Sequence, residues 1–206
     1  MKVLIAGGAG DMSKAIGERL KRLSYQVFMP DRKQMNVTDI KIVKNNVKVF
    51  KPDIIIYGAG YINPHSIKNT EISSFIHHFN INVYGLLYCL KAGIENECKT
   101  FINIGSTSAF EGRENWSAYC ASKASALSLM ESLAKEGYKS YSIHPARTDT
   151  KMRKKLFPNE DKSTLMPTSR IADFVEKCLN NEFSNGSHII IKKNYYYVIP
   201  MRKSLQ

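Results

Sequence analysis

The chain has 206 residues, of which 43% are hydrophobic and 23% charged, the composition of an ordinary globular domain. This balance excludes collagen-like, coiled-coil and generally disordered proteins, and no apolar run approaches the roughly 18 residues that span a bilayer. An excess of 30 Lys and Arg over 18 Asp and Glu gives a net charge of +12, which indicates either a lysine-rich composition or an affinity for anions. We expect a cytoplasmic protein that binds a small molecule, with neither nucleic acid nor a membrane as partner.

Short apolar strands alternate with longer helical patterns along the whole sequence. The pattern predicts strands over 3–6, 26–29, 53–57, 100–104, 141–143 and 187–191, and helices over 15–23, 39–49, 73–96, 118–136 and 169–180. Continuously apolar strands separated by helices are typical of a parallel sheet that is covered on both faces. The sequence therefore predicts a single α/β domain over 1–206, a Rossmann-type doubly wound sheet of about six strands.

Three of the predicted strands end in small or polar residues, namely Gly7–Gly10, Gly58–Gly60 and Gly105-Ser106. In a doubly wound sheet, ligands bind beyond the carboxyl ends of the strands. We therefore expect these three segments to line one crevice. Three unrelated tight turns would explain each segment separately, but would explain their common position less well.

The first of these segments indicates a nucleotide site. Glycines between a strand and a helix let backbone amides approach a pyrophosphate at the helix N-terminus. Asp31 follows the second strand, where a carboxylate would accept hydrogen bonds from an adenosine ribose and repel a 2′-phosphate. This favours NAD over NADP, although Arg32 could instead bind a 2′-phosphate and Asp31 could simply form a turn after Pro30.

A second group of residues indicates acid–base chemistry. Ser106 stands just beyond a buried strand, and Tyr119 and Lys123 lie four residues apart, on one side of a predicted helix. An ammonium near a phenol favours the phenolate, so we expect Lys123 to lower the pKa of Tyr119. Such a tyrosine can exchange a proton with a carbonyl or alcohol oxygen that a serine hydroxyl holds.

These residues resemble the pattern of the short-chain dehydrogenase/reductase family, and the resemblance extends over nearly the whole chain. The family's Ser…Tyr-x-x-x-Lys arrangement matches Ser106, Tyr119 and Lys123, and its Asn-x-x-Gly motif is similar to residues 82–85. The resemblance implies oxidation of an alcohol or reduction of a carbonyl with NAD or NADP. It implies that Tyr119 is the acid/base, Lys123 also binds the nicotinamide ribose, Ser106 polarises the carbonyl and Asn82 holds a water that relays protons.

The same resemblance, with the glycine turn, gives a set of candidate cofactor-binding residues. They are Gly7, Gly10, Asp11, Met12, Ser13, Asp31, Arg32, Asn36, Val37, Gly58, Ala59, Gly60, Tyr119, Lys123, Pro145, Thr148 and Thr150. By this match Thr150 would contact the nicotinamide carboxamide.

The sequence departs from the family's pattern at three places. Asp11 and Ser13 stand where the family's glycine motif has its second and third glycines. The serine at this position is similar to the enoyl-reductase branch. Asp11 would bring a negative charge near a pyrophosphate. Gly58 replaces an asparagine that braces the sheet. Only four residues separate Asp31 from Asn36, a shortening that is similar to the dTDP-dehydrorhamnose reductase branch. These departures leave open a second hypothesis, a non-catalytic nucleotide-sensing or scaffold protein.

Basic and aromatic residues near Ser106, Tyr119 and Lys123 suggest the chemical class of the substrate. Arg113 and Trp116 precede Tyr119, and Arg147 precedes a basic segment over 151–167 that would form a short lid. Guanidinium groups favour phosphates and carboxylates, so we expect an anionic sugar or sugar phosphate, unless the lid is only a solvated basic surface.

Two further expectations concern association and metals. The family resemblance implies a homodimer or homotetramer that pairs through the helices over 73–96 and 118–136. The cysteines form no C-x-x-C pair, and the adjacent His77 and His78 would point apart on a helix, so we predict no metal site.

Overall fold

The strand β1, Lys2–Ala6, shows how the sequence builds a core on each face of the sheet. Its side chains alternate, so that Val3 and Ile5 pack into one apolar cluster while Leu4 and Ala6 pack into a second. Every one of these four side chains is fully buried. A strand that is apolar on both sides requires helices on both sides, as the sequence predicts.

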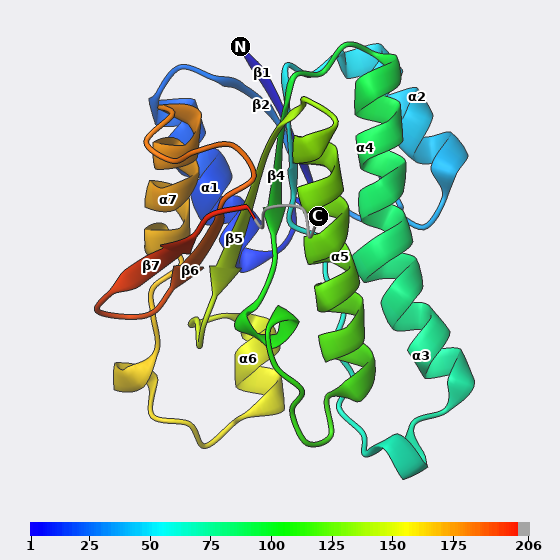
Figure 1. Ribbon diagram of the computed structural model, residues 1–206, viewed down its shortest axis with the longest axis vertical. Coiled ribbons are helices and arrows are strands. Elements are labelled where there is room, and N and C mark those ends of the chain that lie inside the picture. Colours follow the sequence, from blue (N-terminus) through cyan, green and yellow to red (C-terminus); the bar gives the residue numbers. More distant parts are fainter. Residues whose placement is uncertain (202–206) are drawn as a thin grey trace, which may run out of the picture.

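The computed structural model describes residues 1–201 (Figure 1). Its seven-stranded sheet has the order β2-β1-β3-β4-β5-β6-β7, in which the first six strands are parallel and β7 runs antiparallel to β6. The strands other than β1 are β2 (Gln26–Phe28), β3 (Ile54–Tyr57), β4 (Thr100–Ile104), β5 (Lys139–Pro145), β6 (His188–Ile191) and β7 (Tyr196–Ile199). The predicted Rossmann-type fold is confirmed, with one more strand than the six expected.

Helices cover the two faces unequally (Figure 1). One face carries α1 (Asp11–Arg22) and α7 (Ser169–Leu179), and the other carries α2 (Ile40–Phe50), α4 (Gly85–Glu95) and α5 (Ser117–Lys135). Beyond the carboxyl ends of the strands lie α3 (Ile72–Phe79), on the α5 side, and the short helix α6 (Lys151–Leu156). Among residues 1–201, none of the helices combines the length and apolar character that crossing a bilayer requires.

Two local features differ from the expectation. The predicted helix over 73–96 is interrupted by a π-helical turn, Asn80–Tyr84, in which the Ile81 carbonyl accepts a hydrogen bond from the Tyr57 hydroxyl. This bond joins the turn to the end of β3. The strand β7 was not predicted, because its tyrosine-rich sequence lies on an exposed edge and lacks a buried apolar face.

Candidate active site

A cleft of about 390 Å³ crosses the carboxyl edge of the sheet and brings the predicted strand ends together. Its lining includes fourteen of the candidate cofactor residues: Gly7, Gly10, Asp11, Met12, Ser13, Arg32, Asn36, Val37, Gly58, Ala59, Gly60, Tyr119, Lys123 and Thr150. The loops after β1 and β3 and the residue Gly105 after β4 thus line one crevice, as the sequence predicted.

The glycine turn allows a close backbone approach in this cleft. Gly7 has a φ of +78°, and a Cβ on it would lie 2.7 Å from the backbone of Ala59. A Cβ on Gly8 would lie 2.5 Å from the backbone of Met29. The turn leads directly into α1, whose first residues, Asp11 to Ser13, line the cleft. The absence of side chains here and the helix N-terminus fit the pyrophosphate of a dinucleotide.

The departures at Asp11, Ser13 and Gly58 have structural explanations. The Asp11 carboxylate accepts a hydrogen bond from the Lys151 amide at 2.6 Å, so it faces the start of α6 and does not cap its own helix. Ser13 is buried, and a Cβ on Gly58 would collide with the Ser13 hydroxyl. A serine in place of the third family glycine is therefore accommodated by a glycine in place of the asparagine.

In the loop after β2, Asp31 and Arg32 stand in different positions relative to the cleft. One carboxylate oxygen of Asp31 accepts hydrogen bonds from the amides of Lys33 and Gln34, at 2.8 and 2.9 Å, which closes a turn. Asp31 is absent from the described residues that line the cleft, whereas Arg32 is among them. Arg32, rather than Asp31, therefore borders the cleft in this loop.

Tyr119 and Lys123 line this cleft, and Ser106 lines the adjoining cavity together with Tyr119. Ser106 lowers the pKa of the Tyr119 phenol, and its hydroxyl accepts a hydrogen bond from the Ser108 amide at 3.1 Å. The Lys123 ammonium donates to the Ile104 carbonyl at 3.3 Å and lies 5.7 Å from the centroid of the Tyr119 ring. The helix α5 supplies both the tyrosine and the lysine on one side, as their spacing predicted.

The protonation of this group differs from the expectation. Burial raises the pKa of Tyr119 above its ordinary value, and the hydrogen bond with Ser106 and the charge of Arg113 only partly oppose this effect. Burial also lowers the pKa of Lys123 to about 8. In the ligand-free site the expected lowering of the Tyr119 pKa by Lys123 is therefore not found, because burial dominates both groups.

Asn82 lies in the π-helical turn, where both ends of its amide are engaged. Its side-chain oxygen accepts from the Tyr61 amide at 2.9 Å, and its nitrogen donates to the Tyr61 carbonyl and the Ser122 hydroxyl, each at 2.9 Å. Asn82 thereby joins the loop after β3 to α5, which carries Tyr119 three residues before Ser122. This side chain holds the site together through protein contacts.

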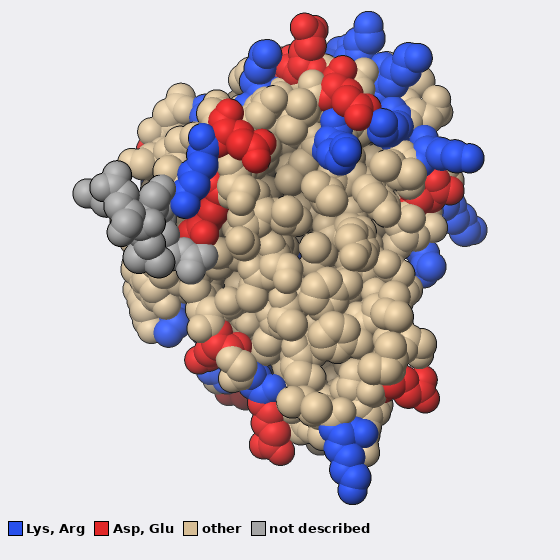
Figure 2. Space-filling model, turned by 45° about the vertical axis from the view of Figure 1, so that its right-hand side comes forward, with Lys and Arg blue, Asp and Glu red and all other residues tan. Residues whose placement is uncertain are grey.

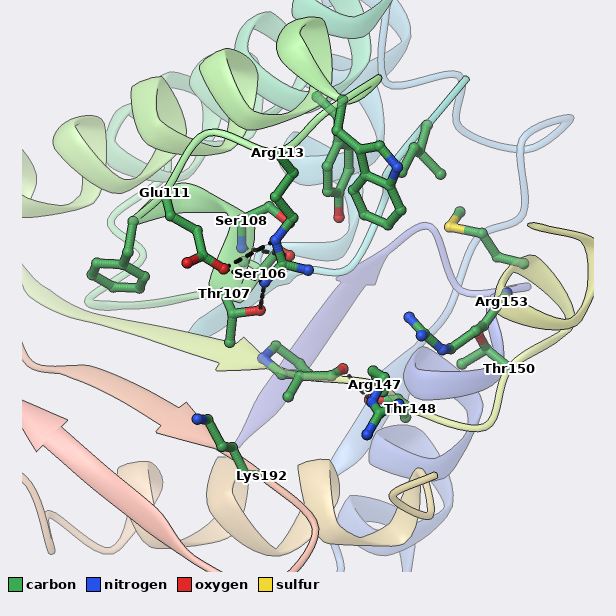
Figure 3. Close-up of a pocket in the computed structure, with 18 of the residues that line it drawn as sticks. Ser106, Thr107, Ser108, Glu111, Arg113, Arg147, Thr148, Thr150, Arg153 and Lys192 are labelled. Atoms are coloured by element: carbon green, nitrogen blue, oxygen red, sulfur yellow. Dashed lines mark hydrogen bonds and ion pairs between the residues drawn. The ribbon is translucent and has the colours of Figure 1, made fainter. Parts of the chain in front are cut away.

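A second, larger cavity of about 600 Å³ adjoins the first (Figure 3). The residues common to both linings are Met12, Gly105, Tyr119, Thr150 and Met152. The candidate substrate residues Arg113, Trp116 and Arg147 line it with Ser106, and so do Pro145 and Thr148, which were expected at the cofactor. Arg153, which belongs to the basic segment expected to cover the substrate, lines the cavity too. Sequence reasoning missed several further lining residues: Thr107, Ser108, Phe110, Glu111, Lys192, Tyr195 and Tyr197.

The charges in the second cavity are predominantly positive (Figure 3). Arg153 forms a two-pronged ion pair with Glu160 at 2.6 and 2.7 Å, and Arg113 pairs with Glu111 at 2.7 Å. Arg147 is 3.5 Å from Glu160 and its side chain is 59% exposed, which leaves its guanidinium accessible. Lys192, at the end of β6, reaches the same cavity.

The parallel sheet, the glycine turn and the group of Ser106, Tyr119 and Lys123 are those of a dinucleotide-binding α/β protein. The family model for short chain dehydrogenases matches residues 1–161. The chain belongs to the short-chain dehydrogenase family and is an oxidoreductase of that family.

Individual comparisons agree with this assignment. The chain is 29% identical over 176 residues to an uncharacterized oxidoreductase of Staphylococcus aureus (strain MRSA252), covering 77% of this chain and 76% of the relative. A solved structure of a small-chain dehydrogenase in complex with NADPH has a TM-score of 0.83 at 17% identity, covering 94% of this chain and 97% of that chain. The ligand-free aldohexose dehydrogenase of Thermoplasma acidophilum has a TM-score of 0.80 at 20% identity, covering 92% of each chain.

Proposed function

We propose that the protein interconverts an alcohol and a carbonyl with a nicotinamide dinucleotide, using Tyr119 as the acid/base. The observation that carries this proposal is the position of Tyr119 at the boundary of two cavities. One cavity has the glycine turn that suits a dinucleotide, and the other has polar and aromatic walls that suit a substrate. A group that exchanges a proton with the substrate oxygen has to lie between them.

Within this proposal each side chain has a role that its contacts support. The bound nicotinamide would supply or accept a hydride at the substrate carbon. Ser106, which lines the same cavity as Tyr119, would donate to the substrate oxygen, and Tyr119 would give that oxygen its proton during reduction. Lys123 would donate to the cofactor ribose and stabilise the phenolate that remains. Asn82 would fix the loop after β3 against α5, beside a water that relays protons.

The alternative, a non-catalytic sensor or scaffold, depended on the departures at Asp11 and Gly58. The Asp11 carboxylate is bonded to the start of α6, and Gly58 makes room for Ser13. Neither residue blocks the cleft, so these departures no longer favour the alternative.

For the cofactor we propose NADP(H) rather than the NAD(H) favoured by the sequence. The support comes from the loop after β2, where one oxygen of the Asp31 carboxylate closes a turn and Asp31 does not line the cleft, whereas Arg32 does. One structural neighbour, the small-chain dehydrogenase described above, was solved with NADPH. A guanidinium at this position can hold a 2′-phosphate through paired, charge-assisted hydrogen bonds.

Replacement of Arg32 tests this preference. Losing a phosphate–guanidinium contact costs about 1.5–3 kcal/mol, so we expect Arg32→Ala to reduce the kcat/KM ratio of NADPH to NADH roughly 10- to 100-fold. The exposed neighbour Lys33, which does not line the cleft, provides a matched control. An unchanged ratio in Arg32→Ala, or an equal change in Lys33→Ala, would contradict the proposed role.

For the substrate we propose an anionic sugar or sugar phosphate, bound beneath the segment over 151–167. Arg147 and Lys192 supply the accessible positive charge, and Trp116, Tyr195 and Tyr197 supply faces on which a ring can stack. Arg113, which the sequence also suggested as an anion ligand, is already paired with Glu111. The structural neighbour named an aldohexose dehydrogenase acts on a sugar, which supports this class.

Kinetics with a charged and an uncharged form of one substrate test this assignment. We expect Arg147→Ala and Lys192→Met each to raise KM roughly fivefold for a sugar phosphate and little for the free sugar, because an exposed contact to a charge contributes about 1 kcal/mol. Lys155→Met, which removes an exposed charge from α6 outside the cavity, is the control. Equal use of both substrate forms by the unmodified protein would exclude an anion-binding role.

We also propose that two copies pair through the face formed by α4 and α5. The only charged residues of α5 before Lys135 are Lys123 and Glu131, and both are buried. The outer positions hold small side chains such as Ala124 and Ser128, and Figure 2 shows a broad uncharged area over these helices. Sedimentation is expected to give a particle of about twice 23.4 kDa or more at micromolar concentration, and a monomer there would contradict the pairing.

A further inference from the structure

One acidic side chain at the cofactor cleft bonds a distant segment of the chain. Asp11, the first residue of α1, lines the cleft. Its carboxylate accepts a hydrogen bond at 2.6 Å from the backbone amide of Lys151, which is the first residue of α6 and lies 140 positions further along the sequence. Hydrogen bonds to an ionised carboxylate are among the stronger ones in proteins, so this bond fixes the start of α6 to the start of α1.

The start of α6 lies where the two cavities meet. Thr150, which precedes the helix, and Met152, in its first turn, line both cavities. The Thr150 hydroxyl accepts a hydrogen bond from the Arg153 amide at 3.1 Å and thereby caps α6 (Figure 3). The position of Thr150 is therefore coupled to that of the helix, and Asp11 holds the helix at the next residue.

The segment over 151–167, which we call the lid, is also held together by its own contacts. At its base, Met166 exchanges two backbone hydrogen bonds of 2.9 Å with the chain that leaves β5. Within it, Arg153 forms its two-pronged ion pair with Glu160. A segment that is closed at its base and fastened inside can shift as one body, so its position over the cavities depends on contacts with the rest of the chain.

Contacts of this kind lie at several points of the lid. Phe157, which follows α6, stacks on Trp116 with ring centroids 6.0 Å apart and an interplanar angle of 29°. The Lys193 ammonium donates to the carbonyl oxygen of Ser163. Trp116 lines the larger cavity and is the only tryptophan of the sequence, so its fluorescence reports whether the end of α6 is in place.

We propose that Asp11 is a positioning residue that anchors α6, and with it Thr150 and Met152, at the junction of the two cavities. This rests on the proposed function, because cofactor and substrate would have to meet at this junction. The bond requires an oxygen acceptor on residue 11 and an amide proton on residue 151. An asparagine side chain also carries such an acceptor, so the anchor should survive loss of the charge but not loss of the oxygen.

Limited digestion with trypsin and the emission of Trp116 test the anchor without using activity. The lid offers exposed sites for trypsin at Lys154, Lys155 and Lys162. We expect cleavage in the lid of Asp11→Ala to be at least fivefold faster than in the wild type, with Trp116 emission shifted to longer wavelength. Asp11→Asn should match the wild type within twofold. Wild-type behaviour of Asp11→Ala, or the same behaviour of both variants, would overturn the proposal.

The anchor can also be broken from its other side. Lys151→Pro removes the amide proton and leaves Asp11 unchanged, and proline suits the first position of a helix. Thr150 has the extended backbone, with φ −141° and ψ 155°, that a residue before proline adopts. We expect Lys151→Pro to release the lid as Asp11→Ala does, and this variant decides the outcome if Asp11→Ala does not fold. A lid in Lys151→Pro that is as resistant as in the wild type would contradict the anchor.

A matched control removes a different carboxylate from the same helix. Glu18 is exposed on α1 and lines neither cavity, so Glu18→Ala should leave cleavage of the lid and Trp116 emission within twofold of the wild type. Release of the lid in Glu18→Ala equal to that in Asp11→Ala would mean that α1 is generally weakened, and would overturn the specific role of Asp11.

Kinetics separate this proposal from the proposed function. With a sugar phosphate and NADP as the probes, we expect Asp11→Ala and Lys151→Pro to lower kcat at least fivefold, and Asp11→Asn to retain kcat within threefold. Unchanged kcat in both of the first two variants would overturn the positioning role. Full activity in Tyr119→Phe would overturn the proposed function, whereas the digestion and emission of the ligand-free protein would still decide whether Asp11 anchors α6.

Discussion

Replacement of Tyr119 by phenylalanine is expected to reduce turnover by roughly a thousandfold or more, which would leave the activity near the detection limit. Tyr119 lines both cavities, and Ser106 in the second cavity lowers the pKa of its phenol. Phenylalanine keeps the ring, its packing against Trp116 and its place beside Lys123, and removes only the hydroxyl.

Cofactor binding provides the control for this prediction. The NADPH dissociation constant of Tyr119→Phe should stay within about threefold of the wild-type value, because most residues that line the cleft belong to the loops after β1, β2 and β3 or to the start of α1. Turnover within tenfold of wild type would mean that another group exchanges the proton. Loss of both binding and turnover would instead indicate a damaged cleft.

Replacement of Lys123 by methionine is expected to have the second largest effect. The change removes the ammonium that would hold the ribose and stabilise the phenolate, so kcat/KM should fall roughly 100-fold or more. In the wild type, kcat/KM should also decline above about pH 8, where the buried ammonium loses its proton. The remaining activity of Lys123→Met should lack this decline, and an identical pH profile would exclude Lys123 as its source.

The lowered pKa of Lys123 also makes the free energy of unfolding depend on pH. Its pKa is lower in the folded chain, about 8, than the ordinary 10.5, so between these values the unfolded chain binds the proton more strongly. The free energy of unfolding should therefore fall as the pH drops from 10.5 to 8. Denaturant unfolding of Lys123→Met, measured over this range, should lack that component.

Much of the fold could be predicted because its signals are local. The apolar runs of β1 and β3 and the helical spacing of α1 and α5 depend on neighbouring residues alone. The strand β7 could not be predicted in the same way, because its side chains are half exposed and its partner β6 is required to define it. The π-helical turn depends on a distant hydroxyl, that of Tyr57.

The candidate site also combines features that local sequence spacing predicted with features that it could not predict. Spacing predicted that Tyr119 and Lys123 share one side of a helix, and the strand ends were expected to line one crevice. Asp31 illustrates the limit, because turn formation and ribose binding require the same residue type at the same place. The bond between Asp11 and the Lys151 amide connects residues 140 positions apart, so no sequence spacing indicates it.

Titration of NADPH into the unmodified protein, followed by the fluorescence of the cofactor, tests directly whether the cleft binds a nicotinamide dinucleotide. We expect saturable binding with a dissociation constant in the micromolar range, weaker binding of NADH, and loss of the NADPH preference in Arg32→Ala. Absence of binding of either cofactor at millimolar concentration would contradict the proposed function and favour a scaffold built on the same fold.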